Sequence, residues 1–245
     1  MEIPAPDPLL AVAALRDGRF DVLQRVPPAW LEQLLGEDDV RVLRYPVPSI
    51  HVLVPNANRP FASNATFRRA LAFAIGREAI LNQELLAGEA VDPLPRGYAP
   101  DQAWGYAYDP GVEVLPYQPR IGVTLARVAE ADLARAAEKA GDARPELSEL
   151  VIGHVDDWLH ARACAAIAAD LNRVGIRCRV QPLASGEDRK LAACDFVYAE
   201  LVMTEPVVDW PQWLAHHPLI RSSDHLNLAI REAAAATNWR QARER

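Results

Sequence analysis

A strand, helix, strand pattern over residues 150–181 constrains the fold of this chain more than any other feature. Leu150–Gly153 is short and apolar, as a buried strand is. Asp157 can cap the following helix and Gly175 can end it. Residues 176–181 then alternate apolar with polar side chains, which is typical of a half-exposed strand. The apolar stripe of the helix comprises Leu159, Ala163, Ile167, Leu171 and Val174. Such a unit predicts an α/β fold, because a helical crossover lets two strands run parallel.

A pair of helices is predicted in the run from Asn56 to Ala90. Ser63 or Asn64 can cap the first helix, and Gly76 interrupts the pattern before a second helix. Gly88 can end that second helix. The first helix buries Phe67, Leu71, Ala74 and Ile75 and exposes Arg68 and Arg69, and the second contains Ile80, Leu81 and Leu85. The pattern alone predicts a helical hairpin packed on another layer.

The remaining elements complete an alternating order of strands and helices. Strands are expected at Phe20–Leu23, Val40–Tyr45, Ser49–Val54 and Asp195–Leu201. Helices are expected from Pro27–Pro28, from Pro211 and from Leu226. A further helix is expected over Ile121–Lys139, with Gly141 just past its end and with Leu125, Ala129, Leu133 and Ala136 on one face. A long connection rich in Pro and Tyr, residues 91–119, separates the hairpin from the next helix, and its length indicates a packed structural or functional loop.

The amino-acid sequence of the hairpin resembles that of the bacterial extracellular solute-binding proteins of family 5, the peptide receptors of ABC importers. The matching positions are Asn56, Phe61, Arg69, Ala70, Leu71, Ala74, Ile75, Arg77 and Gly88. The chain departs from the pattern at Gly76, where an Asp is usual, and in the extra residues 111–119 after a Tyr-x-x-Asp-Pro element. The resemblance implies an α/β lobe of the type II periplasmic-binding-protein fold, with helices flanking a mixed sheet.

The resemblance also implies a domain organisation. It extends from about Gly18 to Trp239, which is about half of a family member and corresponds to its second lobe. We therefore expect a lead-in at residues 1–19, the lobe at residues 20–239, and a truncated helix at residues 240–245. On this expectation the family's first lobe is missing.

Composition excludes several functions. With 33 acidic and 26 basic residues the net charge is −7, which disfavours nucleic acid and anionic membrane surfaces as partners. No run of apolar residues reaches the roughly 18 of a membrane span. Cys164, Cys178 and Cys194 lie in apolar patterns and are expected in the core. The first residues lack the features of a signal peptide, which leaves a cytoplasmic location open, although the resemblance implies an extracytoplasmic, periplasmic one.

Two histidines and two carboxylates gather at a strand-to-helix turn, where α/β proteins often hold ligands. His154, Asp156, Asp157 and His160 could contact a solute or hold a metal ion. The simpler interpretation is that Asp156 or Asp157 caps the helix and both histidines are exposed. We favour the cap, because the spacing matches no standard zinc pattern. His216, His217, Asp224 and His225 are taken as loop residues on the same reasoning.

A second candidate site follows the predicted strand at residues 195–201. Glu200, Glu205 and Asp209 are acids near its end, and Tyr198 and Trp210 could form flat apolar walls beside them. In peptide-binding family members an acid near this strand end meets the amino terminus of the ligand. Here the expected position holds Val202, so Glu200 or Asp209 would have to replace that acid. Glu205 and Asp209 could equally cap the next helix.

These observations predict binding without catalysis. The chain lacks G-x-S-x-G, H-E-x-x-H, G-x-x-x-x-G-K and G-x-G-x-x-G, so no enzyme class, metal or cofactor is indicated. The resemblance implies a peptide or small-molecule solute held in a cleft between two lobes, with ABC transporter permease subunits as partners. An alternative is a lobe reused as a sensor or protein-interaction module. A third hypothesis is a small metal-dependent enzyme centred on His154–His160.

Overall fold

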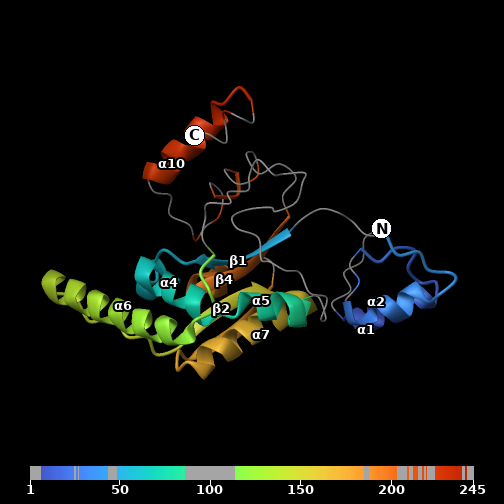
Figure 1. The fold of residues 1–245 in the computed structure, drawn as a ribbon, viewed down its shortest axis with the longest axis horizontal. Helices are drawn as coiled ribbons and strands as arrows, with labels where there is room; N and C mark the ends of the chain where they lie inside the picture. Colours follow the sequence, from blue (N-terminus) through green and yellow to red (C-terminus); the bar gives the residue numbers. More distant parts are fainter. Residues whose placement is uncertain are drawn as a thin grey trace.

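The fold is a mixed sheet covered by a layer of helices (Figure 1). Apart from the sheet, one helical pair lies at the N-terminal side of the molecule and one helix lies near the C-terminus. The computed structural model describes residues 7–24, 26, 28–43, 49–85, 114–184, 188–202, 209, 212–214, 217, 219, 224–238 and 241.

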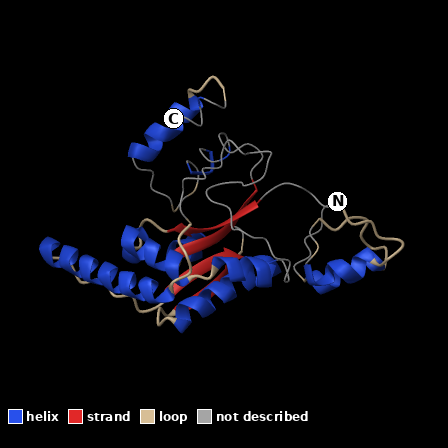
Figure 2. Ribbon diagram, in the orientation of Figure 1, coloured by secondary structure: helices blue, strands red, loops and turns tan. Residues whose placement is uncertain are grey.

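The described strands form one four-stranded sheet in the order β1-β4-β2-β3 (Figure 2). Their bounds are β1 Ser49–Pro55, β2 Leu150–Val155, β3 Cys178–Leu183 and β4 Phe196–Val202. β2 runs parallel to both β3 and β4, whereas β1 pairs antiparallel with β4. The predicted mixed α/β architecture is therefore confirmed, and β3 begins two residues later than the alternation indicated.

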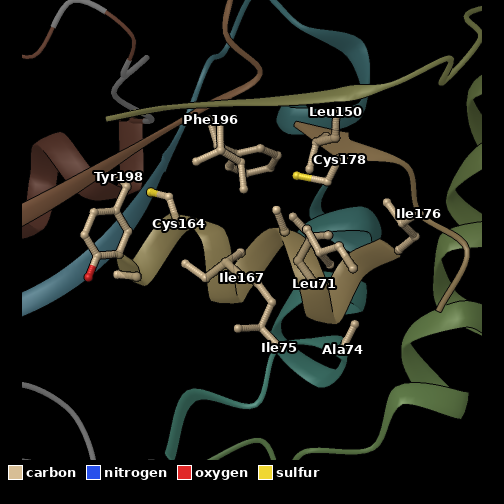
Figure 3. Close-up of a cluster of buried hydrophobic side chains, with 14 of the residues drawn as sticks. Leu71, Ala74, Ile75, Leu150, Cys164, Ile167, Ile176, Cys178, Phe196 and Tyr198 are labelled. Atoms are coloured by element: carbon tan, nitrogen blue, oxygen red, sulfur yellow. The ribbon is translucent and has the colours of Figure 1, made fainter. Parts of the chain in front are cut away.

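Three helices cover one face of this sheet: α4 (Ala65–Ala74), α6 (Pro119–Ala140) and α7 (Trp158–Arg173). Their apolar residues form the main core together with Leu150, Ile152 and Phe196 of the sheet. The side chains of Leu150 and Phe196 point from the strands into this core (Figure 3). Cys164 and Cys178 belong to the same core, and burial raises the pKa of each thiol to about 12. All three cysteines are free and buried, as predicted.

The opposite face of the sheet carries a smaller apolar cluster. Val54, Val151 and Val197 contribute to it from three strands, together with Cys194 and Leu219. Half-buried side chains from α8 (Asp188–Ala193) and from Trp213 pack against this cluster. Both faces of the central strands are thus apolar, which explains why β2 reads as an unbroken apolar run.

Local signals for helix ends are confirmed at four positions. The side chain of Asn64 accepts a hydrogen bond from the Phe67 N–H, and that of Asp157 accepts one from the His160 N–H. Gly141 and Gly175 have φ of 74° and 84°, the left-handed conformation that ends α6 and follows α7. The four residues expected to be buried in α4 and at its end, Phe67, Leu71, Ala74 and Ile75, are at most 6% exposed.

The α6 helix approaches α4 through a glycine. A Cβ atom at Gly122 would lie 2.8 Å from the Ala70 oxygen and 2.9 Å from the Ala74 Cβ, so only glycine permits this approach. The residues buried on α6 are Gly122, Ala129 and Ala137. The predicted contact face was therefore wrong at Ala136, which is exposed, because the close approach rotates α6 toward Ala137.

The second helix of the hairpin is α5 (Arg77–Ala79), which continues as a π-helix, η1 (Ile80–Leu85). Ile80 and Leu85 are buried, as the pattern indicated. The predicted helix end at Gly88 and the connection at residues 91–113 lie outside the described residues.

The N-terminal region differs most from the sequence prediction. α1 (Pro8–Arg16) is capped by Asp7 and lies beside α2 (Pro28–Leu35), with Arg16 Nε 2.6 Å from Glu37 Oε1. The strand predicted at 20–23 is wrong, and residues 40–43 of the strand predicted at 40–45 are not a strand either. Val22 is 80% exposed, so this short alternation has no apolar layer to cover.

The C-terminal helix α10 (Asp224–Ala234) begins two residues before the predicted start at Leu226. Asp224 and His225 are therefore helical and not loop residues, since an acid favours the first turn of a helix. Residues 212–214 are helical, in agreement with a helix beginning near Pro211. Most of the predicted helix after Trp239 lies outside the described residues.

Candidate functional site

The carboxyl ends of β2 and β4 meet the amino end of β1 at one edge of the sheet. This follows from topology, because β2 and β4 are parallel and β1 is antiparallel to β4. In the register, His51 of β1 lies opposite Glu200 of β4, and Tyr198 lies opposite His154 of β2. We call this set the carboxyl-edge cluster: His51, His154, Tyr198 and Glu200, with His160 from the first turn of α7.

All four strand residues of this cluster are on the helix-covered face. Side chains alternate along a strand, so Tyr198 and Glu200 share the face of Phe196, and His154 shares the face of Ile152. Phe196, Tyr198 and Ile152 belong to the main core under α7. The cluster is therefore the polar end of the main apolar core, at the edge where ligands of α/β sheets usually bind.

Tyr198 joins two histidines from different elements. Its hydroxyl lies 2.8 Å from Nδ1 of His51, and the two rings stack with centroids 5.6 Å apart. The ring of His160 meets the other side edge-on, with centroids 5.5 Å apart. Burial, followed by electrostatic interaction with the ionisable groups of Cys164, Glu200 and Asp157, raises the pKa of Tyr198. The phenol therefore keeps its proton and can donate a hydrogen bond to Nδ1 of His51 in the tautomer that leaves Nδ1 without a hydrogen.

His154 and His160 are buried, with 3% and 7% of their surface exposed. The expectation that both are exposed is wrong, because His154 lies on the inner strand β2 and the ring of His160, from α7, packs against Tyr198. Nδ1 of His154 lies 2.8 Å from the Val155 oxygen, and Nδ1 of His160 lies 2.6 Å from Asp157 Oδ2. Asp157 is the helix cap, as favoured, and Asp156 beside it is exposed.

The other predicted site residues have mixed outcomes. Glu200 is half-buried on the cluster face, and Asp209 is half-buried beyond β4. Glu205 and Trp210 lie outside the described residues. Tyr198 is only 4% exposed, so it supports its neighbours from the core and does not form an open wall. His51 was missed, because its position beside Tyr198 depends on a strand pairing 147 residues apart in sequence.

Metal binding depends on how the possible ligand side chains are grouped in the described residues. No group of three or more His, Cys, Asp or Glu side chains there is arranged to hold a metal ion. The ring nitrogen Nδ1 of each cluster histidine, His51, His154 and His160, already lies within 2.8 Å of an oxygen of Tyr198, Val155 or Asp157. The arrangement is suited to contacts with polar groups through hydrogen bonds and charge.

Comparison with known proteins decides the family. The family model described as "Bacterial extracellular solute-binding proteins, family 5 Middle" matches residues 3–206. The chain belongs to this family. No curated protein matches the chain. Within the described residues, no helix is both long and apolar enough to cross a membrane.

Solved structures confirm that this family 5 chain has the fold of a lobe of a type II periplasmic binding protein. NikA from Staphylococcus aureus in complex with Ni(L-His)2 has a TM-score of 0.77 at 14% identity, over 98% of this chain and 50% of that one. DppA from Helicobacter pylori in complex with the peptide STSA has a TM-score of 0.75 at 16% identity, over 98% and 46%. NikZ from Campylobacter jejuni in complex with Ni(L-His) has a TM-score of 0.72 at 18% identity, over 98% and 49%. The family 5 chain thus spans about half the length of these structures.

Proposed function

We propose that this chain binds a small solute, in the first place a peptide, at the surface formed by the carboxyl-edge cluster. Membership of family 5 supports solute binding, and DppA, a protein of similar fold, is described in complex with a peptide. The observation that carries the proposal is the convergence of His51, Tyr198 and Glu200 at the carboxyl edge of the sheet. Ligand sites of α/β proteins are usually formed by polar side chains at the ends of several strands.

The proposed roles follow from charge and burial. Glu200 of β4 supplies negative charge for an ammonium or amide group. Asp156, directly after β2, and Asp209, beyond the end of β4, add to this charge. His51 is oriented by Tyr198 and contributes a polar ring to the same surface. His154 belongs to the buried support of this surface. Glu205 and Trp210 remain predicted contacts.

The mechanism proposed is closure of two lobes on the solute, without chemistry. The chain spans about half the length of the solved structures it resembles, so a second lobe would supply the other half of the contacts. A solute that touches both lobes favours the closed state by its differential affinity. In this scheme the closed receptor delivers the solute to ABC transporter permease subunits outside the cytoplasm.

The test is a titration of the chain with the tetrapeptide STSA, followed by ¹H–¹⁵N spectra. We expect weak, saturable shifts at the amides of His51, Glu200 and Asp156. Glu200→Gln should weaken the affinity about tenfold, the amount expected for a hydrogen bond to a charged group. Glu146→Gln is the matched control, because Glu146 is exposed at the other end of the sheet.

Two results would count against this proposal. Shifts confined to other parts of the molecule would remove the carboxyl-edge cluster as the site. Submicromolar affinity of the chain alone would contradict the two-lobe mechanism, because a single lobe keeps half of the contacts and none of the closure.

A further inference from the structure

A cavity of about 870 Å³ lies on the side of α7 that faces away from the sheet. Its walls come from α5 and η1, from residues 114–117, and from the second half of α7. η1, which continues α5, packs against α7 there (Figure 1). The cavity shares no residue with the carboxyl-edge cluster, and its volume is within the range of small-molecule sites.

The carboxylates Asp170 and Glu84, which line the cavity, form ion pairs with arginines. Asp170 of α7 accepts a hydrogen bond from the Gly76 N–H at 2.8 Å, and its other oxygen lies 2.6 Å from Nη1 of Arg173. Nearby, Glu84 pairs with Arg162 at 2.8 Å. These carboxylates already have cationic partners, so they add little net charge to the cavity.

Arg77 differs from the other arginines of this region. Its guanidinium donates one hydrogen bond to the Leu115 oxygen, and no ion pair of Arg77 occurs within the described part of the chain. Arg77 as a whole is exposed, so solvent can reach its guanidinium, and partial desolvation beside the cavity wall lowers its pKa. Glu78, the adjacent carboxylate, is exposed to solvent. A guanidinium has five N–H donors, so most of those on Arg77 remain for a ligand.

The remaining walls are mainly apolar. Ile80, Tyr117, Ala166 and Ala169 contribute surfaces of carbon, and the ring of Tyr117 lies over Gly76. One wall is the π-helix η1, a rare element that recurs at functional sites. The cavity thus combines one unpaired guanidinium with flat apolar walls.

We propose that this cavity is a second binding site, which takes a small monocarboxylate with an apolar body. Arg77 holds the carboxylate through two parallel N–H···O bonds, the geometry for which a guanidinium is suited. Tyr117 and Ile80 enclose the apolar body, and the Asp170–Arg173 pair keeps Gly76 fixed at the floor. This site is independent of the solute site at the carboxyl edge.

The test uses phenylacetate as the probe and its neutral analogue phenylacetamide as the comparison. In ¹H–¹⁵N spectra of the whole chain, phenylacetate should give saturable shifts at the amides of Gly76, Ile80 and Ala169. Arg77→Gln should weaken phenylacetate at least about tenfold, the loss typical of a charge-assisted hydrogen bond. Phenylacetamide should bind the unaltered chain more weakly than phenylacetate by a similar factor.

Two further variants separate a local effect from a general one. Arg69→Gln removes an exposed arginine of α4 outside the cavity and should leave the affinity for phenylacetate unchanged. Ala166→Leu places a larger side chain in the cavity and keeps Arg77, so it should abolish the shifts that phenylacetate causes at the cavity amides. The proposal is overturned if Arg77→Gln binds phenylacetate as tightly as the unaltered chain, or if no saturable shift occurs at the cavity amides at millimolar probe.

Discussion

The two ends of the sheet hold polar side chains in different ways. At the amino end of β2 and β4, Asn56 is 1% exposed and donates to the backbone oxygens of Ala192 and Cys194 at 3.3 and 2.9 Å. Asp195 accepts a hydrogen bond from the Val151 N–H at 2.8 Å. At the carboxyl end, Tyr198 contacts the side chains of His51 and His160.

This difference indicates that the amino end of the sheet contributes mainly to stability, whereas the carboxyl end is the proposed binding site. A side chain bonded to the backbone cannot change partner without disturbing the strands, so the amino end fixes the fold. At the carboxyl end, contacts between side chains such as Tyr198 and His51 are less closely tied to the strand backbone, which agrees with the ligand site proposed there. Mutations at the amino end should therefore mainly lower stability, and mutations at the carboxyl end should mainly weaken ligand binding.

The largest effect is expected at Asn56. Asn56→Ala removes its hydrogen bonds to the buried Cys194 oxygen, the part-buried Ala192 oxygen and the Asn58 N–H, which should cost about 3 kcal/mol of unfolding free energy. Urea unfolding followed by circular dichroism measures this loss. Asn238→Ala, an exposed asparagine near the C-terminus, is the control and should change stability by less than about 0.5 kcal/mol. A loss at Asn56 no larger than the control would break the distinction between the two ends.

The next effect is expected at Tyr198. Tyr198→Phe keeps the ring in the core but removes the hydroxyl, so stability should fall by about 1 kcal/mol. His51 should also lose its fixed tautomer, which long-range ¹H–¹⁵N spectra of the imidazole report directly. Tyr117→Phe is the control, because Tyr117 is exposed and lies outside the cluster. An unchanged His51 spectrum in Tyr198→Phe would show that Tyr198 does not orient this ring.

Sequence predicted the helices of the core well, because their signals are local. Asn64 and Asp157 lie immediately before α4 and α7 and cap them as expected. The strand predicted at 20–23 failed for a related reason: alternation over a few residues does not show whether another layer exists to be covered. Within the described residues no apolar layer covers Val22, and its side chain is exposed.

The candidate site was predictable only in part. Tyr198 and Glu200 follow from an apolar strand that ends in polar residues, which is a local pattern. His51 depends on the antiparallel pairing of β1 with β4, a contact that local patterns do not contain. The burial of His154 likewise depends on β2 being an inner strand.

A smaller effect on stability is expected at Asp156, which is exposed at the carboxyl end. Asp156→Asn should change the unfolding free energy by no more than about 0.5 kcal/mol, since it breaks no described contact. Under the proposed function it should nevertheless weaken the STSA peptide measurably. A stability loss comparable to that of Asn56→Ala would show that the carboxyl end is as structural as the amino end.

The smallest effect is a pH trend at Asp195, at the amino end. Burial raises the pKa of this carboxyl from 3.8 and outweighs the Val151 N–H, Arg59 and Arg179, which lower it. A raised pKa means that the native state holds the proton more tightly than the unfolded chain does, so ionisation opposes folding. The cost is absent below the unfolded pKa of about 3.9 and grows as the pH rises through the native pKa.

Asp195→Asn removes this ionisation and keeps an oxygen for the Val151 N–H. Its unfolding free energy, relative to that of the unaltered chain, should therefore increase as the pH is raised from the acid range toward neutrality. Denaturant unfolding at a series of pH values measures the trend, and Asp142→Asn, an exposed aspartate, should show none. A relative stability that falls with rising pH would mean that Arg59 and the backbone hydrogen bond outweigh burial, and that the amino end stabilises a charge and not only the backbone.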